Sequence, residues 1–106
     1  MDPATALEGA AGADVVLMDC ATMWLSNLMY ADADIGAETG RLLQAARAAG
    51  LPVIIVSNEV GLGGVRANDL ARRFANAQGT LNQRLAAAAD KVVLVTAGLP
   101  LVLKGG

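Results

Sequence analysis

Short apolar runs alternate with longer segments of helical periodicity along the first half of this chain. Asp14–Cys20 and Val53–Ser57 are apolar runs of strand length, typical of strands buried on both faces of a parallel sheet. Between them, Ala21–Tyr30 and Ala37–Ala49 place apolar residues at helical spacing, and Gly50 follows at the position where helices commonly end. Two strands joined through helices form a crossover unit, which favours an α/β domain.

The second half predicts one long helix followed by two more strands. Lys91–Thr96 is a third apolar strand, and Leu101–Lys104 is a short last one after a turn at residues 98–100. Gly79 allows a bend or break in the long helix, because glycine costs about 1 kcal/mol there relative to alanine. Over residues 67–89 one apolar stripe, which we expect to face the core, recurs every three or four positions: Leu70, Phe74, Ala77, Leu81, Leu85 and Ala88.

These elements predict a single domain. Residues 1–13 are rich in alanine and glycine and form a loose lead-in, whereas residues 14–106 form one α/β domain with a mostly parallel sheet of three to four strands. No linker divides the chain. Met23 and Trp24 are expected to belong to the core rather than to a cofactor platform, and Thr22 to cap the helix that begins beside it.

Composition excludes several classes of site. The chain has one cysteine and no histidine, so a disulfide framework, a Cys/His zinc site and a histidine-based nucleophile system cannot be built from it. Three aromatic residues and a pI of about 4.8 give little support to nucleic-acid binding. Neither a secretory signal pattern nor an apolar run of about 20 residues is present, so we expect a cytoplasmic protein without a membrane span.

Charge is divided unevenly along the chain. The first 59 residues carry 8 acidic and 2 basic side chains, and the remaining residues carry 2 acidic and 6 basic ones. This asymmetry indicates either an anion site in the second half or two halves that attract each other. Arg72, Arg73 and Arg84 on the long helix therefore either face an anionic ligand or belong to a solvated face with salt links to the first half.

Candidate chemistry lies after the strands, because ligands of open parallel α/β sheets collect at the carboxyl ends of strands. Asp19 ends the first strand, and Asn58 and Glu59 follow the second. An acid in the position of Asp19 holds the water shell of Mg²⁺ or a nucleotide hydroxyl in nucleoside-triphosphate sites. The alternative for Asp19 is to cap the next helix, and the alternative for Asn58 and Glu59 is a loop turn. We predict no metal site built by protein ligands alone.

Four strings carry a resemblance to a known family: VSNEVGLG at 56–63, LARRF at 70–74, LNQRLAAAAD at 81–90 and AGLPLVLKG at 97–105. With VVLMDC and TMWLSNLM earlier in the chain, they closely resemble adenosylcobinamide kinase / adenosylcobinamide-phosphate guanylyltransferase, a bifunctional transferase of cobalamin biosynthesis. The similarity covers nearly everything from residue 14 onward. It implies the carboxyl-terminal portion of a P-loop, RecA-like three-layer domain that assembles into homo-trimers.

The resemblance also implies an activity. The family phosphorylates adenosylcobinamide with ATP or GTP and Mg²⁺, and then transfers GMP from GTP, through a histidine, to adenosylcobinamide phosphate. Asp19 falls where the family has an acidic residue that contacts the nucleotide. Asn58 and Glu59 belong to its NEVG string and are expected beside nucleotide or corrinoid, with Arg73 and Arg84 as further candidate contacts.

Two family features have no counterpart in these residues: the GKS phosphate loop with its strand, and the histidine that carries GMP. We therefore expect this chain alone to be inactive, and keep as an alternative a non-catalytic assembly or regulatory module that retains the oligomer surfaces. Without the phosphate-loop strand, strands 14–20 and 52–58 must pair directly, pair with another chain or stay exposed, because unpaired backbone groups are costly. The sequence thus predicts an altered strand order or an intermolecular sheet.

Overall fold

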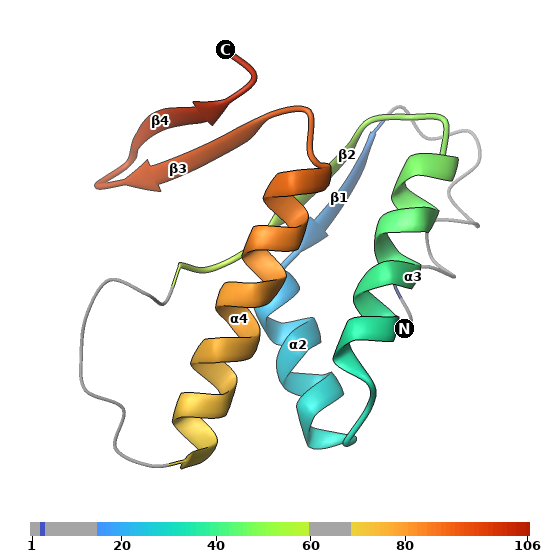
Figure 1. Ribbon diagram of the computed structural model, residues 1–106. Coiled ribbons are helices and arrows are strands. Elements are labelled where there is room, and N and C mark those ends of the chain that lie inside the picture. The colour runs from blue at the N-terminus through green and yellow to red at the C-terminus, as the bar shows by residue number, and fades with distance from the viewer. Residues whose placement is uncertain (1–2, 4–14, 60–68) are drawn as a thin grey trace.

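The computed structural model describes residue 3, residues 15–59 and residues 69–106. The predicted lead-in at residues 1–13, apart from residue 3, and the glycine-rich part of the loop at residues 61–64 lie outside the described residues. In the first half two strands flank two consecutive helices, and the last two strands form a hairpin (Figure 1). The elements are β1 (Val16–Asp19), α2 (Ala21–Tyr30), α3 (Ile35–Ala48), β2 (Val53–Val56), α4 (Asp69–Ala88), β3 (Val92–Thr96) and β4 (Leu99–Lys104).

β1 and β2 form a parallel pair joined through α2 and α3, which confirms the crossover unit and the α/β class. Val16 lies opposite Val53, and Asp19 lies opposite Val56. The two strands pair directly with each other, one of the three outcomes that the sequence predicted. Gly50 lies just after α3, in the connection to β2, and has a φ of 71°. Glycine adopts this backbone conformation without strain.

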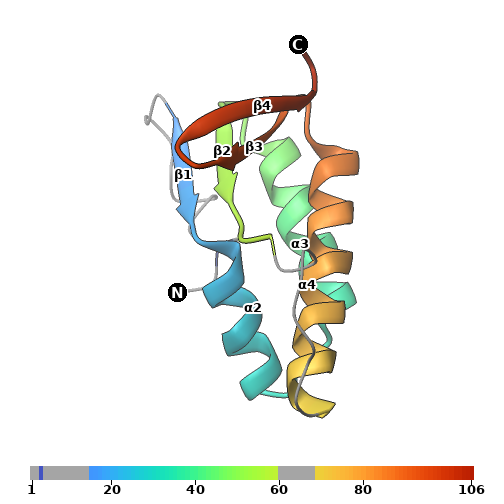
Figure 2. The ribbon, with the colours of Figure 1, turned by 90° about the vertical axis from the view of Figure 1, so that its left-hand side faces the viewer.

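The expectation that these strands are buried on both faces is wrong for the described residues. Helices α3 and α4 lie on one side of the pair (Figure 2), and burial alternates along both strands. Leu17 on the other face is 63% exposed, and Ile54 is 53% exposed. A continuous apolar run predicts a strand whose two faces are both covered by other elements. Among the described elements, helices cover only one face of this strand pair (Figure 2).

The predicted sheet of three to four mostly parallel strands is divided into two separate sheets. β3 and β4 pair with each other in antiparallel fashion and are not hydrogen-bonded to the β1–β2 pair. The reversal occupies Ala97 and Gly98, whose φ angles of 53° and 77° are both positive, as in a type I′ turn. A two-residue reversal of this kind connects only antiparallel neighbours. The turn lies one residue earlier than the sequence predicted.

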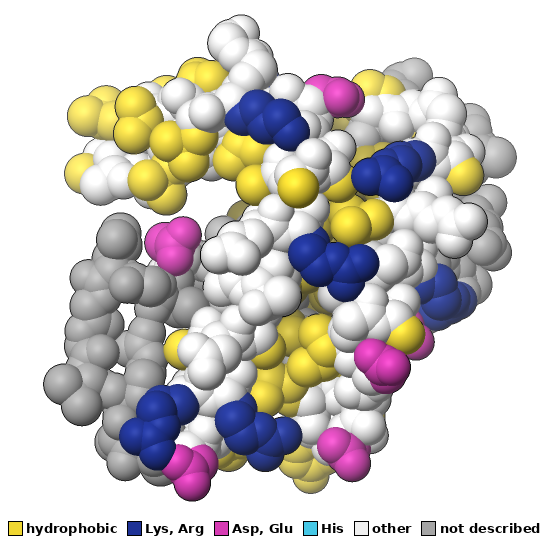
Figure 3. Space-filling model, viewed as in Figure 1, with side chains coloured by type: hydrophobic (Ala, Val, Ile, Leu, Met, Phe, Trp, Pro, Cys, Tyr) yellow, Lys and Arg dark blue, Asp and Glu magenta, His cyan; other side chains and the backbone are white. Residues whose placement is uncertain are grey.

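Lys104, at the end of β4, connects the hairpin to α4. Its Nζ donates hydrogen bonds to the carbonyl oxygens of Ala86 and Ala87, at 2.9 and 3.2 Å. These carbonyls belong to the last turn of α4, where intrahelical partners are missing and a cation is favoured. The hairpin therefore caps α4 with its lysine while most of its apolar side chains stay exposed, as the apolar surface over β3 and β4 shows (Figure 3).

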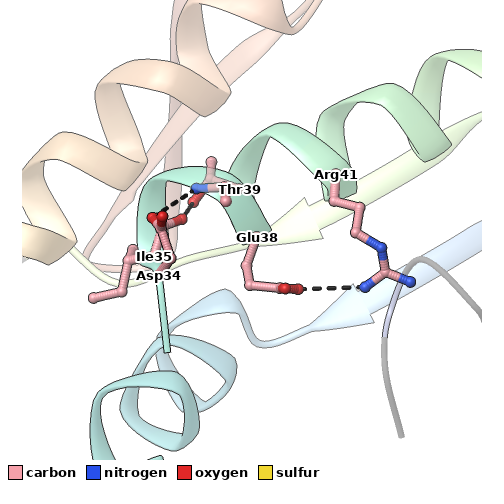
Figure 4. A network of polar contacts seen from close by, with 6 residues as sticks. Asp34, Ile35, Glu38, Thr39 and Arg41 are labelled. Atoms are coloured by element: carbon pink, nitrogen blue, oxygen red, sulfur yellow. Dashed lines mark hydrogen bonds and ion pairs between the residues drawn. The ribbon is translucent and has the colours of Figure 1, made fainter. Parts of the chain in front are cut away.

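Helix α3 begins two residues earlier than its periodicity predicted because Asp34 caps it (Figure 4). An Asp34 carboxylate oxygen accepts a hydrogen bond from the backbone N–H of Ala37 at 3.0 Å. Behind it, the buried Thr39 hydroxyl donates to the Ile35 carbonyl at 2.7 Å. Arg41 and Glu38 form an exposed ion pair at 3.3 Å.

We expect Asp34→Ala to lower the free energy of unfolding by about 1 kcal/mol, because the Ala37 N–H loses its acceptor. Urea denaturation followed by circular dichroism measures this change. Asp34→Asn keeps an acceptor oxygen and is the control, expected within about 0.5 kcal/mol of the unaltered chain. Equal losses for both variants would contradict the capping role.

Helices α2, α3 and α4 all contribute buried apolar side chains to the core, with Leu42 coming from α3. Ala21, Leu25 and Leu81 form its fully buried cluster, and α4 runs without a break through Gly79. Trp24 packs against this cluster, as expected, but Met23 is exposed, so its assignment to the core is wrong. Leu70 is also exposed, because it lies in the first turn of α4, beyond the contacts that bury the rest of the stripe.

Candidate functional site

The carboxyl edge of the β1–β2 pair brings together three of the predicted site residues. Asp19 is the last residue of β1 and lies opposite Val56 in β2. Asn58 and Glu59 follow two and three residues after Val56, so they leave the sheet at the same edge as Asp19. All three are exposed. Because β1 and β2 are parallel, the residues that follow both strands lie at the same edge of the sheet.

Asp19 does not cap helix α2 in this structure. Cys20 is the N-cap residue, and its side chain makes no capping hydrogen bond. The carboxylate of Asp19 forms no hydrogen bond or ion pair with any other residue that the structure describes.

Thr22 is not the cap of α2 either, because its hydroxyl points to the loop after β2. Thr22 Oγ1 accepts a hydrogen bond from the backbone N–H of Asn58 at 2.9 Å. The carbonyl oxygen of Asn58 accepts another from Asn82 Nδ2, also at 2.9 Å. Two helices far apart in sequence thus hold the start of the loop that carries Asn58 and Glu59.

Behind Asn82 lies a small polar cluster between β2 and α4. Ser57 Oγ donates to Asn82 Oδ1 at 2.6 Å. Gln78 Nε2 donates to Ser57 Oγ at 2.9 Å and to Asn82 Oδ1 at 3.0 Å. Gln78 is completely buried, and its Oε1 has no hydrogen-bond partner.

Gln78 and Asn82 are not among the predicted site residues, although the sequence contains one signal for Gln78. Gln78 lies four residues after Phe74 and three before Leu81, so it occupies the apolar stripe of α4 as a polar residue. A polar side chain on a core-facing position must find partners, because an unpaired buried amide is costly. Asn82 follows at the i+4 position and supplies one of those partners.

The two candidate arginines lie away from this edge. Arg73 lines a hollow of about 260 Å³ with Asn76 and Ala77 of α4 and with residues of α2 and the α2–α3 connection. Arg84 donates from Nη1 to the carbonyl oxygen of Gly36 in α3, at 2.9 Å. It lies two positions from Asn82, hence on a different side of α4. Arg84 therefore links α4 to α3 through a backbone carbonyl and not through a salt link to an acidic residue.

Two ion pairs of the described ranges each lie within a single helix. Arg41 pairs with Glu38 and Arg72 with Asp69, each within one helix. No group of three or more His, Cys, Asp or Glu side chains gathers in these ranges in a way that would hold a metal ion. None of the described helices has the length and apolarity needed to cross a bilayer.

Comparison with known proteins decides the family. The sequence model of cobinamide kinase / cobinamide phosphate guanyltransferase matches residues 1–103. The chain belongs to this family. Its parallel strand pair with packed helices agrees with part of the family's P-loop-like domain.

Three curated relatives support the assignment. The bifunctional adenosylcobalamin biosynthesis protein CobP of Pseudomonas aeruginosa is 39% identical over 92 residues, which cover 85% of this chain and 53% of the relative. The proteins CobU of Salmonella typhimurium and Escherichia coli, described in the same words, are each 37% identical over 106 residues, covering 86% of this chain and 59% of the relative. The chain thus spans little more than half the length of these relatives.

Proposed function

We propose that this chain forms the nucleotide-side part of an enzyme that phosphorylates adenosylcobinamide and transfers GMP from GTP to adenosylcobinamide phosphate. Membership of the cobinamide kinase / cobinamide phosphate guanyltransferase family supports the substrate class. The observation that carries the proposal is the meeting of Asp19, Asn58 and Glu59 at one sheet edge, where parallel α/β domains bind their ligands.

Asp19 is the residue we assign to the nucleotide. Its exposed carboxylate has no partner in the described structure, and Mg²⁺ commonly binds through one or two carboxylates together with substrate phosphates. Asp19 thus fits a nucleotide bound with Mg²⁺, which would neutralise charge on the phosphates. Asn58 and Glu59 would contact nucleotide or corrinoid beside it, and Arg73, in its separate hollow, would meet an anionic group farther along α4.

GMP transfer needs groups that these 106 residues do not contain. In the proposed reaction a histidine nitrogen attacks the α-phosphorus of GTP and pyrophosphate leaves; an oxygen of adenosylcobinamide phosphate then takes GMP from the histidine. The chain has no histidine and no Gly-Lys pair, so neither the nucleophile nor the phosphate-binding lysine comes from it. The chain alone should bind GTP more weakly than about 1 mM, since phosphate contacts dominate such sites. Isothermal titration calorimetry measures this affinity.

We expect transfer to appear when the chain is mixed with the part of the Salmonella typhimurium relative that lies outside the matched region. The measurement is GMP transfer from radiolabelled GTP to adenosylcobinamide phosphate. Asp19→Asn should lower the rate of GMP transfer in this mixture about 10- to 100-fold, because the carboxylate that would hold the Mg²⁺ bound with the nucleotide is lost. Asp90→Asn, an exposed acid after α4, is the control. An assembled mixture without transfer, or equal rates for both variants, would argue against the proposal.

The alternative, a non-catalytic assembly module that forms homo-oligomers, is favoured by one observation. Leu99 is 70% exposed, and other large apolar side chains of β3, β4 and the β1–β2 pair are also exposed, as at protein interfaces. Mixing the chain with an intact relative and measuring masses by native mass spectrometry tests this role. Mixed oligomers in which Asp19→Asn leaves transfer unchanged would favour assembly over catalysis.

A further inference from the structure

The peptide groups of Asn58 are held on both sides by side chains from different helices. Its N–H donates to Thr22 Oγ1 of α2, and its carbonyl accepts from Asn82 Nδ2 of α4, each at 2.9 Å. Thr22 and Asn82 are 36 and 24 residues away in sequence. A loop turn closed by local hydrogen bonds, the alternative considered for Asn58, does not explain these contacts.

The amide of Asn82 has only one orientation that satisfies its neighbours. A backbone carbonyl is an acceptor only, so the atom of Asn82 that faces Asn58 must be the donor Nδ2. Oδ1 then faces Ser57 Oγ and Gln78 Nε2, at 2.6 and 3.0 Å, and accepts from both. Turning the amide round would place Oδ1 against the Asn58 carbonyl. Ser57 and Gln78 therefore fix the donor that holds Asn58.

We propose that Thr22 and Asn82 are positioning residues for the candidate site. They fix the backbone of Asn58, so the exposed side chains of Asn58 and Glu59 stand at the edge beside Asp19 before a nucleotide binds. This inference rests on the proposed function, because it assumes that this edge of the sheet binds the nucleotide. Preorganisation of this kind lowers the ordering cost that a ligand would otherwise meet.

Hydrogen exchange of the Asn58 amide tests the inference directly in the 106-residue chain. Thr22→Val keeps the shape of the side chain and removes the acceptor, so exchange of the Asn58 amide should rise about tenfold. Exchange of the Val16 amide, bonded to Pro52 in the sheet, should not change. Thr22→Ser restores the hydroxyl and should restore protection. Thr80→Val, an exposed threonine on α4, is the control.

A second variant keeps the test decisive if Thr22→Val does not fold. Asn82→Asp retains the acceptor for Ser57 and Gln78 but replaces the donor, so the carbonyl ¹³C resonance of Asn58 should move upfield. Unchanged exchange in Thr22→Val, unchanged resonance in Asn82→Asp, or failure of Thr22→Ser to restore protection would overturn the inference.

Activity supplies the readout that a purely structural role would not move. In the mixture that transfers GMP, Thr22→Val and Asn82→Asp should lower kcat/KM about tenfold, with Thr22→Ser and Thr80→Val within about twofold of the unaltered chain. Faster exchange at Asn58 with unchanged kcat/KM would overturn the inference. A mixture with the unaltered chain that transfers nothing counts against the proposed function alone, and the exchange and resonance measurements then decide this inference.

Discussion

Replacing Leu81 with alanine is expected to lower the free energy of unfolding by about 2 to 5 kcal/mol. Leu81 lies in the middle of α4 and is 1% exposed, and it packs with Ala21 and Leu25 of α2 in the buried cluster. The substitution removes buried methyl groups and leaves a cavity between the two helices. Because few of the described side chains are fully buried, a large share of the core that they form is lost. Urea denaturation followed by circular dichroism measures the change.

Leu70→Ala is the matched control, because it is the same substitution on the same helix. Leu70 is 65% exposed, so little apolar area returns to water and the expected change is within about 0.5 kcal/mol. Comparable losses at both positions would mean that the core does not lie where α2 and α4 meet.

Gln78→Glu is expected to destabilise the chain at neutral pH by about 3 to 5 kcal/mol, because it buries an unpaired charge. Gln78 is fully buried, and its Nε2 donates to Ser57 Oγ and Asn82 Oδ1. The variant replaces this donor with a carboxylate oxygen that faces two oxygens. Thermal unfolding at pH 7 measures the loss.

Acidification should recover part of that stability. Burial without a positive partner raises the pKa of the introduced carboxyl in the folded state above its value in the unfolded chain. The folded state then binds the proton more tightly, so the recovered stability is complete below the unfolded pKa and is lost as pH rises through the folded pKa. Gln83→Glu, on the exposed side of α4, is the control and should change stability by about 0.5 kcal/mol or less at either pH. A penalty for Gln78→Glu that does not depend on pH would contradict this account.

Local signals in the sequence predicted most of the elements. The apolar runs predicted β1, β2 and β3, and helical periodicity predicted α2, α3 and the long α4. Gly50 marked the end of α3 because a positive φ favours glycine. These features depend on spacing and on single-residue backbone preferences, both of which can be read along the chain.

Part of the candidate site could also be predicted. A carboxylate at the end of one strand and a polar pair after the next share an edge whenever the two strands are parallel, so Asp19, Asn58 and Glu59 needed only the crossover unit. Family resemblance added the chemistry that this edge would serve. The positions of the arginines could not be predicted in this way. Arg73 and Arg84 share helix α4 with Asn82, but Arg73 lines a separate hollow and Arg84 contacts Gly36 of α3.

By itself, the sequence determined the order and type of the elements, the family, and the absence of a histidine and a Gly-Lys pair within these residues. Only the tertiary structure decided which strands pair, that β3 and β4 stand apart as a hairpin, and that Thr22, Gln78 and Asn82 converge on the loop after β2. The reason is physical: periodicity reports which face of an element is apolar, whereas pairing and convergence depend on contacts between residues tens of positions apart.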